Sequence, residues 1–226
     1  MLLTGSHTVD DVIKHTHFME LAYTPLAGDI DALPSPRILN NHQGFLNQPT
    51  DMLRKNNKVI FVYRNPKDVA VSLYHHCSTL NWFTSGRVDF RSFLQTFVDG
   101  LTPFGFYSDY LREWERGIKA NKSLNICLTS YEDMQEDPLR EVAKLAKFLG
   151  KSYDDEFLQN VIRATHIDNM RTAKVKVEAP QLTRLYRKGK VGDWKNQFTV
   201  ADSEWFDRIF RNRMADSDLF TFRYEL

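Results

Sequence analysis

A nearly continuous apolar run followed by an asparagine–proline pair is the feature that most constrains the fold of this chain. Residues 58–63, Lys-Val-Ile-Phe-Val-Tyr, are rich in β-branched and aromatic side chains. This pattern is typical of a strand buried on both faces of a parallel sheet. Asn65 can cap a helix, and Pro66 suits its first position. Because the apolar spacing over 66–80 is helical, residues 58–80 predict a strand, a tight turn and a helix.

A second buried strand and several helices are expected in alternation along the chain. Residues 124–129 repeat the apolar strand pattern, and helices are predicted over residues 8–22, 89–100, 104–119, 138–149, 154–164 and 199–214. This alternation indicates an α/β fold with a mainly parallel central sheet flanked by helices. Loops are expected over the proline-containing 24–36 and over the polar, basic 171–194, whose length favours a functional role. Nothing marks a boundary within residues 1–226, so we expect a single domain.

The composition excludes several classes of protein. Lys and Arg number 30 against 29 Asp and Glu, a net charge of +1, so no global field attracts nucleic acid or an anionic membrane. No run approaches the roughly 18 apolar residues of a transmembrane helix, and the N-terminal residues lack an apolar secretion segment. The two cysteines, Cys77 and Cys127, form no disulfide framework and fit a reducing compartment. We therefore expect a cytoplasmic protein.

Arg64 stands where the predicted strand ends and the predicted helix begins, the place at which open α/β sheets bind ligands. The first amides of such a helix point outward, and its dipole favours an anion. A guanidinium beside them makes a phosphate or sulfate site. Ser72, about two turns into the helix, could add a hydroxyl donor. The alternative is a structural arginine paired with Asp68 or with a nearby loop.

The segment 185–194 is a second candidate anion site, because three cations lie beside two glycines. Glycine lets backbone amides approach an anion closely. Arg187 can bind a phosphate bidentately, while Lys188 acts as a point charge. One alternative is a solvated basic loop. A nucleic-acid patch is disfavoured, because aromatic residues are sparse in the segment and the net charge is near zero.

His42 follows two asparagines at the end of a possible short strand over 37–42. Its unperturbed pKa of about 6.5 lies near the operating pH, so it could act as a general base. The alternative is an ordinary surface histidine. The run 75–77, His-His-Cys, does not predict a metal site, because neighbouring helical residues point about 100° apart and cannot readily share one ion.

Taken together, these motifs resemble the cytosolic sulfotransferase family from about residue 17 to the C-terminus. The most specific match is 187–199, Arg-Lys-Gly-Lys-Val-Gly-Asp-Trp-Lys-Asn-Gln-Phe-Thr, followed by 63–72, and residues 131–134 and 35–42 support them. The family moves a sulfonyl group from 3′-phosphoadenosine 5′-phosphosulfate (PAPS) to a hydroxyl or amine. The resemblance implies a P-loop-like sulfotransferase fold and a small phenol, alcohol or amine as acceptor, with no metal. A nucleotide kinase is disfavoured, since the chain lacks Gly-x-x-x-x-Gly-Lys-Ser/Thr.

The resemblance also implies roles for individual residues. Five match positions that hold the 3′-phosphate of PAPS: Arg64, Ser72, Arg187, Lys188 and Gly189. Four match contacts to the adenine: Tyr131, Thr165, Ile167 and Met170. His42 matches the base that takes the acceptor proton, and Phe18 matches an aromatic wall of the acceptor pocket. Four match a dimerisation pattern, which implies a homodimer with a small interface: Lys195, Thr199, Val200 and Glu204.

Three departures from the family pattern bear on activity. The family's loop of the form Thr-Tyr-Pro-Lys-Ser-Gly-Thr-Thr-Trp, which cradles the 5′-phosphosulfate, is not among these residues, so we expect the first strand and this loop to be absent. Asn40 stands where the family usually has a lysine near the bridging oxygen, and Ile167 where an aromatic ring often stacks on adenine. The alternative function is a catalytically impaired relative that binds adenosine 3′,5′-bisphosphate (PAP) or regulates a full-length sulfotransferase by dimerising with it.

Overall fold

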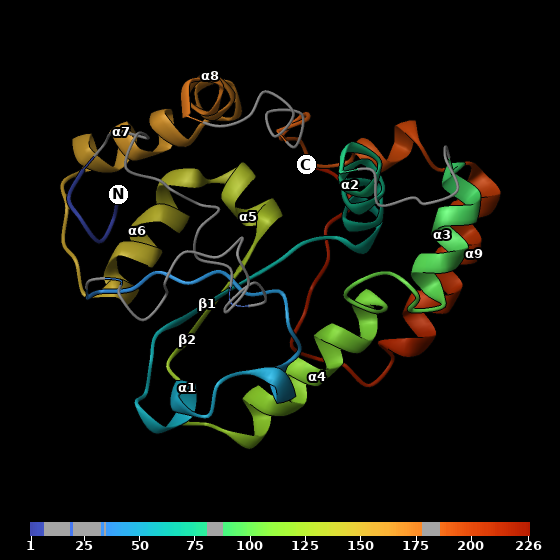
Figure 1. Ribbon diagram of the computed structural model, residues 1–226, viewed down its shortest axis with the longest axis horizontal. Helices are drawn as coiled ribbons and strands as arrows, with labels where there is room; N and C mark the ends of the chain where they lie inside the picture. The colour runs from blue at the N-terminus through green and yellow to red at the C-terminus, as the bar shows by residue number, and fades with distance from the viewer. Residues whose placement is uncertain (7–18, 20–32, 34, 81–87, 178–185) are drawn as a thin grey trace.

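Two parallel strands form the centre of the structure, a computed structural model that describes residues 1–6, 19, 33, 35–80, 88–177 and 186–226. Strand β1 (Val59–Tyr63) pairs with β2 (Ile126–Ser130), with Val59 opposite Ile126 and Tyr63 opposite Ser130. The predicted parallel sheet is therefore confirmed (Figure 1). Most of the predicted loop over 24–36 and nearly all of the predicted helix over 8–22, Phe18 included, lie outside the described residues.

The helices lie close to where the sequence predicts them. Within the described residues they are α1 (Asp51–Arg54), α2 (Pro66–Thr79), α3 (Phe90–Val98), α4 (Tyr107–Ala120), α5 (Tyr131–Glu136), α6 (Pro138–Leu149), α7 (Asp155–Thr165), α8 (Ile167–Val177) and α9 (Val200–Arg213). Two short 3₁₀ helices cover Phe45–Asn47 and Asp193–Asn196. The sequence does not predict α1, α5 or α8.

Helices cover the strands from two sides (Figure 1). On one side, the Phe61 ring of β1 lies 4.8 Å from Trp114 and 5.8 Å from Tyr110 of α4, between ring centroids. On the other, the Thr129 hydroxyl of β2 donates to Glu141 Oε2 of α6 at 2.9 Å. The carboxyl end of each strand leads directly into a helix, and the residues at these two junctions carry the candidate site.

The prediction that the strand over 58–63 is buried on both faces is wrong. Phe61 is only 4% exposed, but Ile60 is 41% exposed and Val62 is 52% exposed. In the parallel register Val62 lies beside Thr129, and α6 covers the β2 side of that face. Within the described residues the β1 side of the same face is open. A continuous apolar run does not show how far a covering helix extends.

The prediction of a loop over 171–194 is wrong for its first part, because α8 continues to Val177. No glycine or proline interrupts the helix, and its arginine, methionine, lysine and alanine residues are strong helix formers. The Thr172 hydroxyl donates to Asp168 O at 2.9 Å inside the helix. Residues 186–194 do form an ordered, glycine-containing loop, which we call the basic loop.

Candidate functional site

The turn from β1 into α2 is closed by a buried asparagine. The Asn65 side-chain oxygen accepts from the Asp68 backbone N–H at 2.8 Å, which confirms the predicted cap in front of Pro66. Its Nδ2 donates to Asp68 Oδ2 at 3.0 Å and to Glu132 Oε1 of α5 at 3.1 Å. Since all these side chains are buried, the turn that presents Arg64 is held on both sides.

The contacts of Arg64 are compatible with both interpretations of its sequence position, a structural pair with Asp68 and a donor to a ligand anion. Its Nη2 donates to Asp68 Oδ2 at 3.1 Å and to the Lys190 carbonyl of the basic loop at 2.8 Å. Its guanidinium lies over the Tyr131 ring at 4.0 Å from the centroid. Its Nε is buried and has no hydrogen-bond acceptor within the described part of the chain. The structural pairing with Asp68 thus leaves the Nε donor of Arg64 without an acceptor among the described residues.

The basic loop is held against α2 through its backbone. Gly192 N donates to Asp68 Oδ2, and Trp194 N donates to Asp68 Oδ1, both at 2.9 Å. Together with the bond from Arg64 to Lys190 O, these contacts join two segments more than 120 residues apart. The two candidate anion sites of the sequence therefore form one site.

Asp193 pairs with two of the three cations of the basic loop. It forms ion pairs with both Arg187 and Lys188, and its own side chain is buried. Burial opposes its charge, but hydrogen bonds from Lys188, Asn196 and Arg187 outweigh this and lower the pKa of Asp193. The two cations are thus oriented by a carboxylate that stays ionised.

Helix α8 lies against the other end of the basic loop. Gly189 has a φ of +66°, and a Cβ built on it would lie 3.0 Å from Ile167 Cβ. Arg171 donates from Nε and Nη2 to Tyr186 O, at 3.1 and 2.8 Å, and from Nη2 to Arg187 O at 2.8 Å. The predicted adenine residue Ile167 is thereby brought next to the predicted phosphate residues.

The remaining predicted nucleotide residues lie on the same elements. Ser72 is exposed on α2, and Met170 is half-buried on α8. Thr165 is exposed at the end of α7, where its hydroxyl donates to Val161 O at 2.8 Å. Within the described residues no hydrogen bond joins these side chains to Arg64 or to the basic loop.

His42 lies on a segment that is fastened to α4. Its ring packs against Phe104 with centroids 5.0 Å apart. Trp114 Nε1 of α4 donates to the carbonyl of the next residue, Gln43, at 3.2 Å. Burial lowers the pKa of His76 on α2, and the charge of His42 lowers it further, so His42 also lies near α2.

The possible strand over 37–42 is reduced to a single strand-like contact at Asn40. The Asn40 carbonyl accepts from Met19 N at 2.9 Å. The residues around it have no regular structure, and Asn41 holds the turn by donating from Nδ2 to Gln48 Oε1 at 2.7 Å. Side-chain bonds of this kind satisfy a turn without a strand ladder.

The four residues of the predicted dimerisation pattern are all exposed: Lys195, Thr199, Val200 and Glu204. Val200, the first residue of α9, is 77% exposed. Thr199 has a second task, since its hydroxyl accepts from Asp202 N at 3.1 Å and caps the helix. An exposed apolar side chain among polar ones is compatible with a small contact surface.

Sequence reasoning missed several residues that build the site. Asp193 and Arg171 received no role, and Lys67 was not considered. Lys67 is 3% exposed; its Nζ donates to Asp207 Oδ2 at 2.7 Å and lies 4.2 Å from the centre of the Trp194 ring. The sequence signal that could have found Lys67 is Arg64-Asn65-Pro66-Lys67-Asp68, which places an arginine, a helix cap, a lysine and an acid within one turn.

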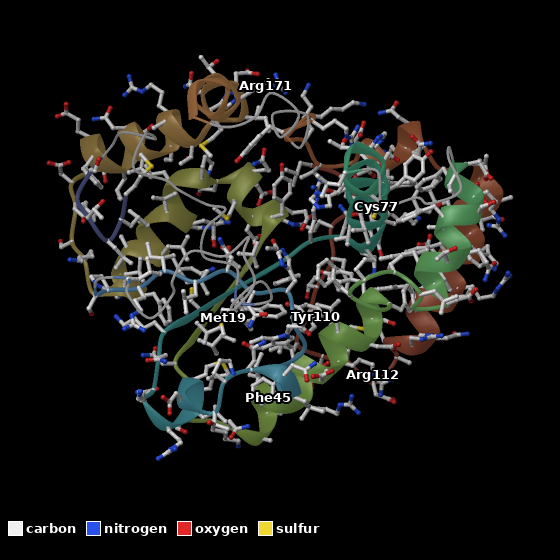
Figure 2. The ribbon with its side chains drawn as sticks, in the orientation of Figure 1. Met19, Phe45, Cys77, Tyr110, Arg112 and Arg171 are labelled. Atoms are coloured by element: carbon white, nitrogen blue, oxygen red, sulfur yellow. The ribbon has the colours of Figure 1, made fainter. Side chains whose placement is uncertain are left out.

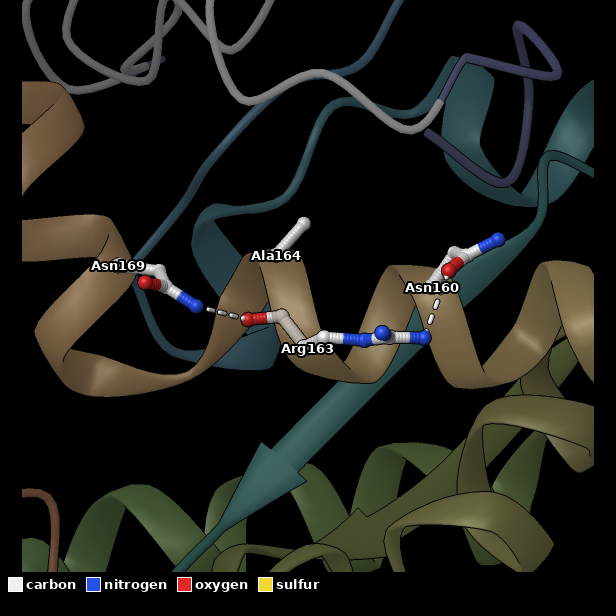
Figure 3. A pocket seen from close by; sticks show the side chains of 4 residues that line it. All are labelled: Asn160, Arg163, Ala164 and Asn169. Carbon is white, nitrogen blue, oxygen red and sulfur yellow. Dashed lines mark hydrogen bonds between the residues drawn. The ribbon is translucent and has the colours of Figure 1, made fainter.

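A shallow surface depression lies at the junction of α7 and α8 (Figure 3). It is lined by Asn160, Arg163, Ala164 and Asn169. Arg163 Nη2 donates to Asn160 Oδ1 at 2.8 Å, and Asn169 Nδ2 donates to Arg163 O at 2.7 Å. Its polar groups therefore bond mainly to one another.

The described residues contain neither a metal-binding group nor a membrane-spanning helix. No group of three or more His, Cys, Asp or Glu side chains is arranged to hold a metal ion there. None of the helices in the described part of the chain combines the length and the apolar character that crossing a membrane requires.

Comparison with known proteins gives consistent matches. A family model for the sulfotransferase domain matches residues 4–218. Sulfotransferase 1C2 of Homo sapiens is 31% identical over 220 residues, which are 92% of this chain and 73% of that protein. Amine sulfotransferase of Oryctolagus cuniculus is 31% identical over 219 residues, 92% of this chain and 71% of that protein.

Solved structures share the arrangement of strands and helices. The crystal structure of mouse sulfotransferase SULT7A1 complexed with PAP superposes with a TM-score of 0.73 at 29% identity, over 86% of this chain and 73% of that one. Retinol dehydratase in complex with androsterone and inactive cofactor PAP gives 0.72 at 24% identity, over 84% of this chain and 57% of that one. This second likeness concerns the fold alone.

Proposed function

Since the chain belongs to the sulfotransferase family, we propose that it transfers a sulfonyl group from PAPS to a hydroxyl or amine of a small acceptor. The observation that carries this proposal is the convergence of Arg64 and the basic loop, joined by the 2.8 Å bond from Arg64 Nη2 to Lys190 O. Asp193 holds Arg187 and Lys188 of the same loop close to each other. Cations at a helix N-terminus suit a phosphate group.

The donor nucleotide would be held by residues from α2 and the turn before it, from the basic loop, and from α5, α7 and α8. The 3′-phosphate would lie among Arg64, Ser72, Arg187, Lys188 and Gly189. The adenine would lie among Tyr131, Thr165, Ile167 and Met170. Two features fit this ligand: the buried Arg64 Nε without an acceptor in the described residues, and Gly189, whose missing Cβ leaves its backbone close to Ile167.

His42 would act as the general base of the transfer. When bound, PAPS supplies the sulfonyl group and a bisphosphate leaving group. A neutral hydroxyl is a weak nucleophile, so a base that takes its proton as the oxygen attacks sulfur lowers the barrier. The His42 ring is held by Phe104 and by the neighbouring Gln43 carbonyl bond to Trp114. Asn40 supplies no charge beside it, which lowers the expected rate.

Calorimetric titration with PAP tests the nucleotide site first. We expect micromolar binding to the wild-type chain and at least a tenfold loss on Arg187→Ala. Labelled PAPS with a panel of phenols, alcohols and amines then tests transfer. Binding without transfer to any acceptor would favour the alternative, a PAP-binding or regulatory relative. No binding at millimolar PAP would contradict the proposal.

We also propose that the chain works in the cytoplasm as a homodimer, through Lys195, Thr199, Val200 and Glu204. The support is the exposure of all four on one short stretch and the apolar Val200 at its centre. Analytical ultracentrifugation of wild type and Val200→Glu tests it. A wild-type monomer at tens of micromolar would contradict the dimer. A mixed species with a full-length sulfotransferase would favour the regulatory alternative.

A further inference from the structure

We propose that Asp68 is a positioning residue that holds the basic loop in register with Arg64. The inference rests on the proposed function, because it assumes that these two elements bind one phosphate group. It concerns a residue that would not touch that phosphate. Asp68 acts through the backbone of the loop and through the guanidinium of Arg64.

Four donors converge on the Asp68 carboxylate, which is 2% exposed. Oδ2 accepts from Arg64 Nη2 at 3.1 Å, Asn65 Nδ2 at 3.0 Å and Gly192 N at 2.9 Å. Oδ1 accepts from Trp194 N at 2.9 Å. One side chain therefore fixes the strand–helix turn and the far end of the basic loop at once.

A carboxylate is the side chain that this position requires. Both of its oxygens accept, whereas an amide of the same shape has one accepting oxygen and would place a donor against either Trp194 N or the donors that meet Oδ2. Hydrogen bonds to an ionised group are about twice as strong as neutral ones. The basic loop contains Gly189 and Gly192, both at positive φ, so without such an anchor it would have many accessible conformations.

The charge of Asp68 argues against a role in ligand attraction. A buried anion in the first turn of α2 opposes the binding of a second anion at the same helix terminus. A site selected only for positive potential would not contain it. The geometric gain, two backbone amides and a guanidinium held at fixed positions, is what this residue provides.

The control comes from Lys67, the neighbouring residue that anchors α2 to the rest of the fold. Lys67 joins α2 to α9 through Asp207 Oδ2 at 2.7 Å. Asp207→Asn therefore removes a carboxylate contact of the same helix. Because Lys67 also lies over the Trp194 ring, the Gly192 amide is the readout for this control. Asp68→Asn keeps the shape of the side chain but withdraws one acceptor. Comparing the two variants separates positioning from stability.

Hydrogen exchange of the ligand-free protein provides the first measurement. In Asp68→Asn the amides of Gly192 and Trp194 should exchange at least tenfold faster than in wild type, and in Asp207→Asn the amide of Gly192 should be unchanged. Exchange at wild-type rates in Asp68→Asn would overturn the inference. Because this arm uses no ligand, it decides the inference even if the wild-type chain fails to bind PAP, a failure that would overturn the proposed function.

Calorimetry with two probes provides the second measurement. PAP carries a 3′-phosphate, and adenosine 5′-monophosphate lacks it. We expect Asp68→Asn to weaken PAP binding at least tenfold and to change monophosphate binding less than twofold. An equal loss for both probes would show a merely structural role and overturn the inference. If Asp68→Asn does not fold, Asp68→Glu, which keeps the charge but shifts the carboxylate, should show the same selective loss, and wild-type PAP affinity in it would overturn the inference.

Discussion

The proposed nucleotide half and the proposed acceptor half of the site are held by different interactions. In the nucleotide half, the buried carboxylates of Asp68 and Asp193 bind backbone amides and cations. In the acceptor half, the segment around His42 rests on α4 through the edge-to-face contact of Phe45 with Trp114, with centroids 5.3 Å apart. Figure 2 shows Phe45 beside α4 and Arg171 on α8, well separated in that view.

This difference has a consequence for specificity. Buried charged hydrogen bonds depend steeply on geometry, so they fix one ligand shape. Apolar packing tolerates substitutions that conserve side-chain volume at small cost. The nucleotide half should therefore accept one donor, while the acceptor half can be remodelled between relatives. Variants in the acceptor half should therefore leave PAP affinity unchanged, and variants in the nucleotide half should leave turnover at saturating PAPS unchanged.

Replacing His42 is the strongest test of this separation. We expect His42→Ala to lower turnover with labelled PAPS by about 10²–10⁴-fold, the usual contribution of a general base. PAP affinity should stay within twofold, because no nucleotide contact is lost. Steady-state assays and calorimetry on one preparation measure both quantities. Unchanged turnover would remove His42 from the reaction, and a parallel loss of PAP affinity would contradict the separation of the halves.

Gly117 tests whether the acceptor half depends on packing against α4. A Cβ at Gly117 would lie 2.2 Å from Phe45 Cγ, so the ring must move in Gly117→Val. Overpacking of this kind costs roughly 2–3 kcal/mol of unfolding free energy. Turnover should fall with it, and PAP affinity should not. Ala120 is exposed at the end of the same helix, so Ala120→Val should leave the unfolding free energy and turnover unchanged. Denaturant unfolding, the turnover assay and PAP calorimetry measure these effects.

The sequence predicts the framework of this protein better than its contacts. The Asn65–Pro66 turn and the parallel α/β order follow from local pattern, and the sulfotransferase fold is confirmed by the family and its structures. Ile60 could not be predicted as exposed, because burial depends on how far α6 extends. Arg171 carries no local motif; its role appears only when α8 packs against the basic loop. Long-range hydrogen bonds are set by tertiary packing.

Acid titration sharpens the comparison, since Glu115 of α4 supports both halves. It accepts from the amides of Asp218 and Leu219, at 3.1 and 3.2 Å. The same C-terminal segment receives the Trp194 side chain, whose Nε1 donates to Tyr224 O at 3.0 Å. Burial opposes the charge of Glu115, but the hydrogen bonds around it outweigh burial and lower its pKa to about 2.

A carboxyl whose folded-state pKa is depressed contributes stability above its ordinary pKa of 4.5 and loses it as the pH falls toward 2. We expect Glu115→Gln to lower the unfolding free energy at pH 6 by on the order of 2 kcal/mol. This figure allows for solvent screening of the ion pair between Glu115 and the half-exposed Lys119. The difference from wild type should shrink at pH 3. Denaturant unfolding at both pH values measures this, and a difference independent of pH would contradict it.

The smallest expected effect lies in the nucleotide half, at Arg171. Its guanidinium binds the carbonyls of Tyr186 and Arg187, so Arg171→Ala frees the first residues of the basic loop while Asp68 still holds the last. We expect PAP affinity to fall about tenfold, or 1.4 kcal/mol, with turnover at saturating PAPS unchanged. Arg163→Ala is the matched control, because that exposed arginine of α7 bonds to Asn160 on its own helix. Equal effects of the two variants would show that α8 does not position the loop, and a fall in turnover at saturation would show that the two halves are coupled.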